Sequence, residues 1–176
     1  MQHLVYIGIG SNLGDRNANC VSALCKLKET DRVEIIASSK WRETRAVTAD
    51  GETQPNYING VVKIFTDLSP EDLLKRLKDI ERELGRPREH KKWSLRTIDL
   101  DILFYDDIVL NSDDLVIPHP EIQKRIFVLE PLCDIEPKLL HPVLKRTVRQ
   151  LYDVIASEAK QSHESPGIDS ALRASQ

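Results

Sequence analysis

Two aspartates, Asp99 and Asp101, interrupt the apolar middle of the stretch RTIDLDILFYDD, which spans residues 96–107. This stretch is typical of a buried β-strand, and side chains two residues apart on a strand point to the same face. The two carboxylates would therefore lie about 7 Å apart and repel each other by about 2 kcal/mol at an effective dielectric constant near ~20. Mg²⁺ removes such a repulsion, since it commonly binds one or two carboxylates together with substrate phosphates.

A basic segment at residues 86–96 directly precedes the acid pair and contains one acidic residue, Glu89. Its cationic side chains belong to Arg86, Arg88, Lys91, Lys92 and Arg96. Separately, the two features have an ordinary explanation as a solvated acid pair and a solvated basic loop. Together they favour a metal–polyphosphate site, because carboxylates hold the metal while guanidinium groups bind phosphate oxygens in pairs.

The bulk composition restricts the class of protein. With 176 residues and 40% hydrophobic residues, the chain suits one globular domain with a sizeable core, which we place at residues 1–155. The formal net charge of −3 argues against a broad basic surface for nucleic acid or an anionic membrane. We find no apolar run near the roughly 18 residues of a membrane span, and we expect no signal peptide at the N-terminus.

The cysteines indicate a reducing environment. Cys20, Cys25 and Cys133 form no C-x-x-C pair, and an odd number without a disulfide framework favours free thiols. We therefore expect a cytoplasmic protein.

Hydrophobic periodicity predicts an alternation of strands and helices along the chain. We expect strands at 4–10, 32–43, 57–67 and within 96–107, and helices at 15–30 and 69–85. The order β-α-β-β-α-β is that of a ferredoxin-like core, an α+β fold in which right-handed crossovers place both helices on one face of an antiparallel sheet. The segment at 44–56 is long for a hairpin loop, and such loops are often functional.

The remaining elements are shorter. Ser69 and Gly85 are typical of the start and end of the second helix. After a turn at Asp106–Asp107 we expect a short extra strand at 108–110, and then C-terminal helical pieces over 119–155. We expect these pieces to be broken by Pro120, Pro131, Pro137 and Pro142. Residues 156–176 contain few large apolar side chains, so we expect a disordered polar tail.

Four stretches together resemble the 6-hydroxymethyl-7,8-dihydropterin pyrophosphokinases of folate biosynthesis. They are YIGIGSNLGD (6–15), PNYING (55–60), RTIDLDILFY (96–105) and VIPHPEIQKRIFVLEPL (116–132). The resemblance covers about residues 4–150, in the order and spacing of the family. It implies an ATP- and Mg²⁺-dependent diphosphokinase that transfers a diphosphate group from ATP to the hydroxymethyl group of the pterin and releases AMP.

The resemblance also implies roles for individual residues. Asp99 and Asp101 would bind two Mg²⁺ ions between the ATP phosphates, and Arg86 and Arg96 would act on the polyphosphate as catalytic residues. The implied pterin contacts are Thr44, Tyr57, Asn59, Trp93 and Phe127. The implied ATP contacts are Lys78, Glu81, Arg88, His119 and Arg125. The partners would be these two small molecules, with neither nucleic acid nor membrane, and we expect a monomer.

The residue types suit these roles, because a flat pterin buries well between aromatic rings and an amide can both donate to and accept from its edge. Each also has an ordinary explanation as a core aromatic, a strand-edge amide or a turn residue. The glycine-rich start is not a dinucleotide-binding fingerprint, since Leu13 stands where the third glycine would fall. We expect Gly10, Ser11 and Asn12 to shape the strand end beneath the pterin.

The chain also departs from the family pattern. Arg42 stands where an aromatic residue is common, and Glu89 stands where a basic residue can occur. The loop that follows Thr44 lacks the proline-rich segment found in some members.

Two other classes of protein fit parts of the sequence. A Mg²⁺-dependent phosphohydrolase or nuclease could use the same acid pair without a pterin. A non-enzymatic ferredoxin-like module could bind RNA or a regulatory nucleotide, although 5% aromatic residues and a negative net charge argue against RNA. ATP turnover that depends on added pterin would separate these alternatives from a pyrophosphokinase.

Overall fold

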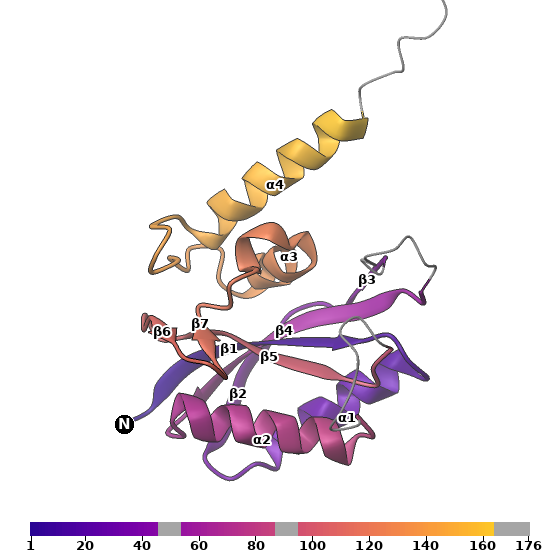
Figure 1. Ribbon diagram of the computed structural model, residues 1–176, viewed down its shortest axis with the longest axis vertical. Helices are drawn as coiled ribbons and strands as arrows, with labels where there is room; N and C mark the ends of the chain where they lie inside the picture. The colour runs from indigo at the N-terminus through magenta and orange to yellow at the C-terminus, as the bar shows by residue number, and fades with distance from the viewer. Residues whose placement is uncertain (46–53, 87–94, 164–176) are drawn as a thin grey trace, which may run out of the picture.

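A central antiparallel β-sheet organises the chain, and the computed structural model describes residues 1–45, 54–86 and 95–163. The strands are β1 (His3–Ser11), β2 (Val33–Ser38), β3 (Arg42–Thr44), β4 (Tyr57–Thr66), β5 (Asp99–Tyr105), β6 (Leu110–Asn111) and β7 (Val116–Ile117). The helices are α1 (Arg16–Lys28), α2 (Pro70–Glu83), α3 (Ile126–Ile135) and α4 (Val148–His163), with a 3₁₀ turn at Ile122–Lys124. Figure 1 shows α1 and α2 on one side of the sheet and α3 and α4 on the other.

The strand order confirms the predicted ferredoxin-like α+β fold. The main sheet runs β2–β4–β1–β5 with antiparallel neighbours, and β3 pairs with β4 along the same edge as β2. The first and last strands of the core, β1 and β5, therefore lie side by side. The prediction that α1 and α2 share one face of the sheet is also confirmed.

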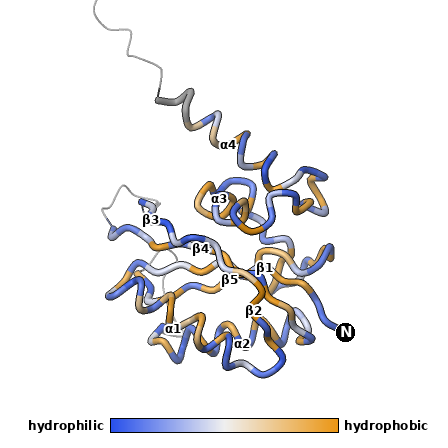
Figure 2. The backbone as a smooth tube through the Cα atoms, turned by 180° about the vertical axis from the view of Figure 1, so that it is seen from behind, coloured by the Kyte–Doolittle hydropathy of each residue, from blue (hydrophilic) through white to orange (hydrophobic). Residues whose placement is uncertain are grey.

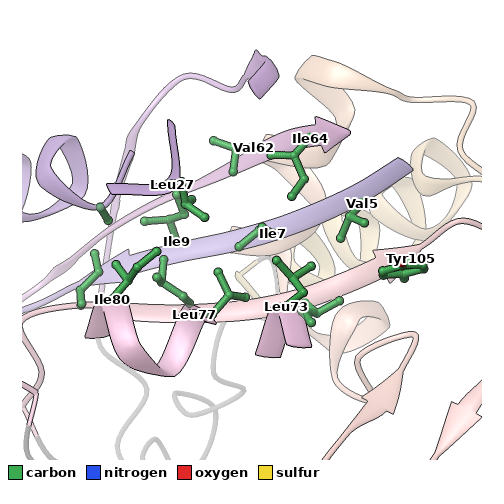
Figure 3. Packing of buried hydrophobic residues seen from close by; sticks show 14 of the residues in the cluster. Val5, Ile7, Ile9, Leu27, Val62, Ile64, Leu73, Leu77, Ile80 and Tyr105 are labelled. Carbon is green, nitrogen blue, oxygen red and sulfur yellow. The ribbon is translucent and has the colours of Figure 1, made fainter. Parts of the chain in front are cut away.

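The face under α1 and α2 carries the larger core (Figure 3). Both helices begin at a side-chain cap, because Asp15 accepts from the N–H of Ala18 and Ser69 accepts from that of Asp72. Their apolar faces then pack on the inner residues of the sheet. The buried side chains include Val5, Ile7, Ile9, Leu27, Val62, Ile64, Leu73, Leu77 and Ile80.

A second cluster of buried apolar residues lies on the opposite face, beneath α3 and α4. A β-bulge in β5 contributes to it: Ile7 pairs with Ile102 and Tyr6 pairs with Phe104, which leaves Leu103 as the extra residue. Leu103 and Phe104 consequently both join this cluster. In Figure 2 the hydrophobic residues are concentrated in the strands and in α3.

Two predictions for the middle of the chain need correction. The strand expected at 32–43 is two strands, β2 and β3. Between them the hydroxyl of Ser39 accepts from the N–H of Val61 at 2.9 Å and donates to the carbonyl of Lys40 at 3.0 Å. Pro131 does not break a helix but lies inside α3. It lacks an N–H for the helix, and the full burial of Leu129 and Leu132 offsets this loss.

The C-terminal elements differ slightly from expectation. The extra strand predicted at 108–110 is β6, which begins at Leu110 and forms a hairpin with β7. Helix α4 continues to His163, past the domain boundary that we expected at residue 155. Leu151, Tyr152 and Ile155 pack one side of α4 against the second cluster, which holds the helix that follows Pro142.

Two further expectations concern the chain as a whole. The three cysteines are free thiols, as predicted. Among the helices that the structure describes, none combines the length and apolar character needed to cross a membrane.

Candidate active site

Three neighbouring strands bring polar side chains together around Gly10. Gly10 of β1 pairs with Asn59 of β4 on one side and with Asp99 of β5 on the other. Residues that pair across an antiparallel ladder point to the same face, so Asn59 and Asp99 rise on either side of a glycine. Asp101, opposite Gly8, lies on this face too, while the alternate apolar residues of β5 are buried under α1 and α2. The prediction that the acid pair shares one face of a strand is confirmed.

Glycine at position 10 leaves space between these polar groups. A β-carbon there would lie 3.0 Å from Oδ1 of Asn59 and 3.7 Å from Cδ1 of Tyr57. Both side chains therefore lean over the glycine. This placement agrees with the expectation that Gly10 shapes the strand end below the expected pterin contacts.

The expected pterin contacts on β3 and β4 lie together. Thr44 pairs with Tyr57, and Nδ2 of Asn59 donates to the hydroxyl of Thr44 at 2.7 Å. Asn59 is buried and Tyr57 is half-buried. Burial raises the pKa of the Tyr57 hydroxyl, whereas the nearby charge of Arg96 lowers it. Tyr57 thus lies beside the charged groups of β5.

Two arginines hold Asp99. Nη1 of Arg96 lies 2.6 Å from Oδ2 of Asp99, and Arg86 pairs with the other carboxylate oxygen. Burial by itself would raise the pKa of Asp99, but the charges of Arg96 and Arg86 outweigh it and hold this pKa below its usual value. Asp99 is therefore an ionised group with its charge already balanced.

Asp101 has a different environment, although it lies only two residues away. Burial and the negative charge of Asp99 raise the pKa of Asp101. The charges of Lys78 and Arg125, and that of His119 when it is protonated, oppose this rise without cancelling it. Burial lowers the pKa of His119 itself. Asp101 is therefore the carboxylate that would gain most from an added cation.

Glu81 lies beneath the acid pair and bonds α2 to β5. Its Oε1 accepts from the N–H of Leu100 at 2.8 Å and from Nη1 of Arg86 at 2.6 Å, and its Oε2 lies 3.1 Å from Nζ of Lys78. Burial raises the pKa of Glu81, while Lys78 and then Arg86 lower it. Glu81 was expected to contact ATP, but here this buried carboxylate, 2% exposed, bonds to the protein.

The remaining expected ATP contacts that the structure describes gather around Asp101. The N–H of His119 donates at 3.0 Å to the carbonyl of Leu103, the bulged residue of β5, so the bulge fixes His119 near the acid pair. Arg125 lies just before α3, with its guanidinium 5.8 Å from the centre of the Phe127 ring. This contact connects an expected ATP residue to an expected pterin residue. Lys78 projects from α2 and is 45% exposed.

Two expected site residues, Arg88 and Trp93, lie outside the described residues. Within residues 1–45, 54–86 and 95–163, no group of three or more His, Cys, Asp or Glu side chains could hold a metal ion. The acid pair is therefore a two-carboxylate site, and phosphate oxygens or water would have to complete the coordination of a cation.

Comparison with known proteins identifies the family. The model of the 7,8-dihydro-6-hydroxymethylpterin-pyrophosphokinase family matches residues 6–137. The chain belongs to this family. It is 41% identical to the 2-amino-4-hydroxy-6-hydroxymethyldihydropteridine pyrophosphokinase of Aquifex aeolicus, over 83% of this chain and 88% of that protein. It is 40% identical to the Synechocystis enzyme of the same name, over 87% of this chain and 76% of that protein.

Solved structures support the fold of this pyrophosphokinase family member. The Plasmodium falciparum HPPK-DHPS wild type with pteroate has a TM-score of 0.74 at 18% identity, covering 94% of this chain and 44% of that one. The chain thus spans under half of that protein. The predicted family and the predicted class of enzyme, a pyrophosphokinase, are both confirmed.

The structure adds Asn12 to the residues that organise the site. From the sequence we expected Asn12 only to shape a strand end. Oδ1 of Asn12 accepts from the N–H of Arg96 at 2.8 Å, and the N–H of Asn12 donates to the carbonyl of Arg96 at 3.2 Å. Asn12 is 1% exposed, so these bonds fix the backbone of a predicted catalytic arginine. The sequence signal was an asparagine at the end of a buried strand, where a side-chain amide often bonds a neighbouring backbone.

Proposed function

We propose that this pyrophosphokinase transfers a diphosphate group from ATP to the hydroxymethyl group of 6-hydroxymethyl-7,8-dihydropterin and releases AMP. The observation that carries the proposal is the row formed by Asn59, Gly10 and Asp99 across three strands. It puts an amide suited to a pterin edge next to a carboxylate pair surrounded by cationic side chains. Family membership and the names of the relatives support the same reaction.

We also propose that Asp99 and Asp101 hold two Mg²⁺ ions when ATP binds. The residues fit such ions, because the pair supplies oxygen ligands. Burial and the charge of Asp99 raise the pKa of Asp101, and a bound cation would lower it again. Bound Mg²⁺ would neutralise the phosphate charge that develops during transfer.

Arg86 and Arg96 would change partners during binding. Both contact Asp99 in this structure, and a guanidinium group binds a phosphate as readily as a carboxylate. The phosphates of ATP would therefore compete with Asp99 for these arginines. Asn12 and Glu81 hold the two arginines close to the acid pair, so only short side-chain movements are needed.

In the proposed reaction, the hydroxymethyl oxygen attacks the β-phosphorus in line. The new O–P bond forms as the bond between the β-phosphorus and the α,β-bridging oxygen breaks, AMP leaves, and the hydroxyl proton passes to solvent. Such transition states need little proton abstraction, so positioning and charge stabilisation contribute most. We propose that the loops at 44–56 and 86–96 exclude water, which is the competing nucleophile.

The remaining assignments are also proposals. We expect the enzyme to act in the cytoplasm as a monomer on these two small molecules. Arg88 and Lys78 are proposed to assist ATP binding, and Trp93 is proposed to cover the pterin.

Phosphorus NMR of the protein mixed with ATP, Mg²⁺ and 6-hydroxymethyl-7,8-dihydropterin tests the function. AMP and a pterin diphosphate should appear together, and only when the pterin is present. Asp101→Ala should lose nearly all turnover. Release of ADP or free phosphate without pterin would instead indicate a phosphohydrolase, and bound but unchanged ATP would indicate a binding module.

A further inference from the structure

Arg42 connects the strand β3 to the helix α3 through a forked ion pair. Its Nη1 and Nη2 lie 2.6 Å and 3.0 Å from the two carboxylate oxygens of Asp134, and its Nε lies 3.1 Å from Oε1 of Glu130. Asp134 also accepts from the N–H of Lys40 at 3.2 Å. Three donors at the entry of β3 thus converge on one carboxylate of α3.

The two elements joined in this way carry opposite parts of the expected pterin site. Arg42 pairs with Asn59 on β4, and Thr44 lies two residues further along β3 on the same face of the sheet. On α3, Phe127 precedes Glu130 by three residues and Asp134 by seven, a spacing that places the three on one side of a helix. The ion pairs therefore lie between Asn59 and Thr44 on one side and Phe127 on the other.

A second arginine fixes the other face of the same hairpin. Nη1 of Arg16, at the start of α1, donates to Oε1 of Glu43 at 2.8 Å and to the carbonyl of Asn56 at 2.7 Å. Because Glu43 lies between Arg42 and Thr44, its side chain points to the face opposite theirs. Arg16 thus anchors the hairpin to α1. Arg42 anchors it to α3 near the pterin site, and Lys63 of β4 pairs with Glu136 at the C-cap of α3, at 3.0 Å.

We propose that Arg42 is a positioning residue that sets the separation between the β3–β4 side of the pterin site and Phe127. The inference rests on the proposed function, because it concerns the width of the pterin site. Arg42 touches neither substrate in this scheme and acts through Thr44, Asn59 and Phe127.

Arg42→Met tests the proposal, since it keeps the apolar stem and removes the fork. We expect the dissociation constant for the pterin to rise about tenfold, which corresponds to about 1.4 kcal/mol of binding free energy. The KM for the pterin should rise in parallel, while kcat at saturating pterin and the affinity for ATP stay as in the wild type. If Arg42 had a purely structural role, Arg42→Met would instead weaken the binding of the pterin and of ATP together.

Arg32→Met is the matched control, because Arg32 makes an ion pair with Asp67, at 2.5 Å, in the loop that leaves β4 at its far end. It should leave pterin affinity unchanged. A double-mutant cycle with Asp134→Asn adds a second readout. The double variant should have the same pterin affinity as Arg42→Met alone, since both changes break the same contact between Arg42 and Asp134. The charge reversal Arg42→Asp with Asp134→Arg should restore part of the pterin affinity.

The outcomes separate the two proposals. Pterin affinity equal in Arg42→Met and Arg32→Met, with an active wild type, would overturn the positioning role and leave the proposed function intact. A wild type that does not bind the pterin would overturn the proposed function and this inference with it. If Arg42→Met does not fold by near-ultraviolet circular dichroism, Asp134→Asn carries the test, because it leaves Arg42 its pair with Glu130.

Discussion

The backbone N–H of Leu100 lies 2.8 Å from Oε1 of Glu81, so helix α2 is bonded to β5 at the residue between Asp99 and Asp101. The same carboxylate holds Arg86 at 2.6 Å. One buried glutamate therefore fixes both the strand that carries the acid pair and an arginine that neutralises it.

Replacing Glu81 should destabilise the protein. Glu81→Ala removes the acceptor of the buried N–H of Leu100, and leaving a buried donor unsatisfied costs about 1–3 kcal/mol. Arg86 keeps its pair with Asp99, so its charge is not left without a partner. Urea denaturation followed by circular dichroism measures the loss. Glu83→Ala on the same helix is the control, because its ion pairs with Lys26 and Arg76 are more exposed and should contribute little. Equal stability of the two variants would show that the contacts of Glu81 do not stabilise the protein.

Asp101→Asn should stabilise the metal-free protein at neutral pH while it abolishes turnover. The pKa of Asp101 is raised in the folded state, so its ionised form lowers the stability of the wild type, and a neutral amide removes this cost. The stability gained by the variant should be complete at neutral pH. It should shrink as the pH falls through the raised pKa of the folded protein, and vanish below the unfolded value of about 3.9.

Unfolding in urea with EDTA present, at a series of pH values, measures this difference. Asp99→Asn is the matched comparison, and it should lower the stability of the metal-free protein at neutral pH. The pKa of Asp99 is lowered by Arg96 and Arg86, so its ionised form contributes stability at neutral pH that is lost as the pH falls through its folded pKa. A destabilised Asp101→Asn would show that neighbouring cations already balance this carboxylate.

Arg96→Ala should slow the chemical step more than it weakens pterin binding. A cationic donor that acts on developing phosphate charge typically contributes about a hundredfold to the rate or more. Single-turnover kinetics at saturating substrates measures the step, and pterin titration measures binding. Equal losses in both would instead assign Arg96 a role in positioning the pterin.

Gly10→Ala should weaken pterin binding with little effect on ATP. The added methyl group would lie 3.0 Å from Oδ1 of Asn59, so the amide would have to move away from the pterin edge. Isothermal titration with each substrate checks this. Unchanged pterin affinity would show that Asn59 can shift without loss, and that its present position is not the one used for binding.

The fold and the acid pair could be predicted from the sequence because both depend on local patterns. The alternation of Ile98, Asp99, Leu100 and Asp101 determines which side chains face the core once the segment is a strand. Ser69 and Asp15 marked the helix starts for the same reason: a cap is a contact between residues three positions apart.

Contacts between distant segments could not be predicted in this way. Nothing local in the sequence indicates that Arg42 reaches Asp134, or that Arg86 lies between Glu81 and Asp99. The bulge at Leu103 depends on pairing with Tyr6 and Ile7, so it is decided by the partner strand. The prediction that Pro131 breaks a helix was wrong, because the burial of α3 offsets the free-energy cost of a proline inside a helix. That burial cannot be predicted from the residues next to Pro131.

The central place of β1 has a consequence for how the protein acquires activity during folding. Gly10 meets Asn59 and Asp99 only after two long chain segments have closed, and β5 is the last strand of the main sheet to be synthesised. Closing such loops costs entropy before any native contact repays it, so these pairings form slowly. The β1–β4 pair can assemble first, with Asn59 in place and no carboxylates beside it. A nascent chain would therefore acquire the β3–β4 part of its pterin site before its phosphate side, and catalysis would begin only when β5 has docked and α3 has brought Phe127 into place.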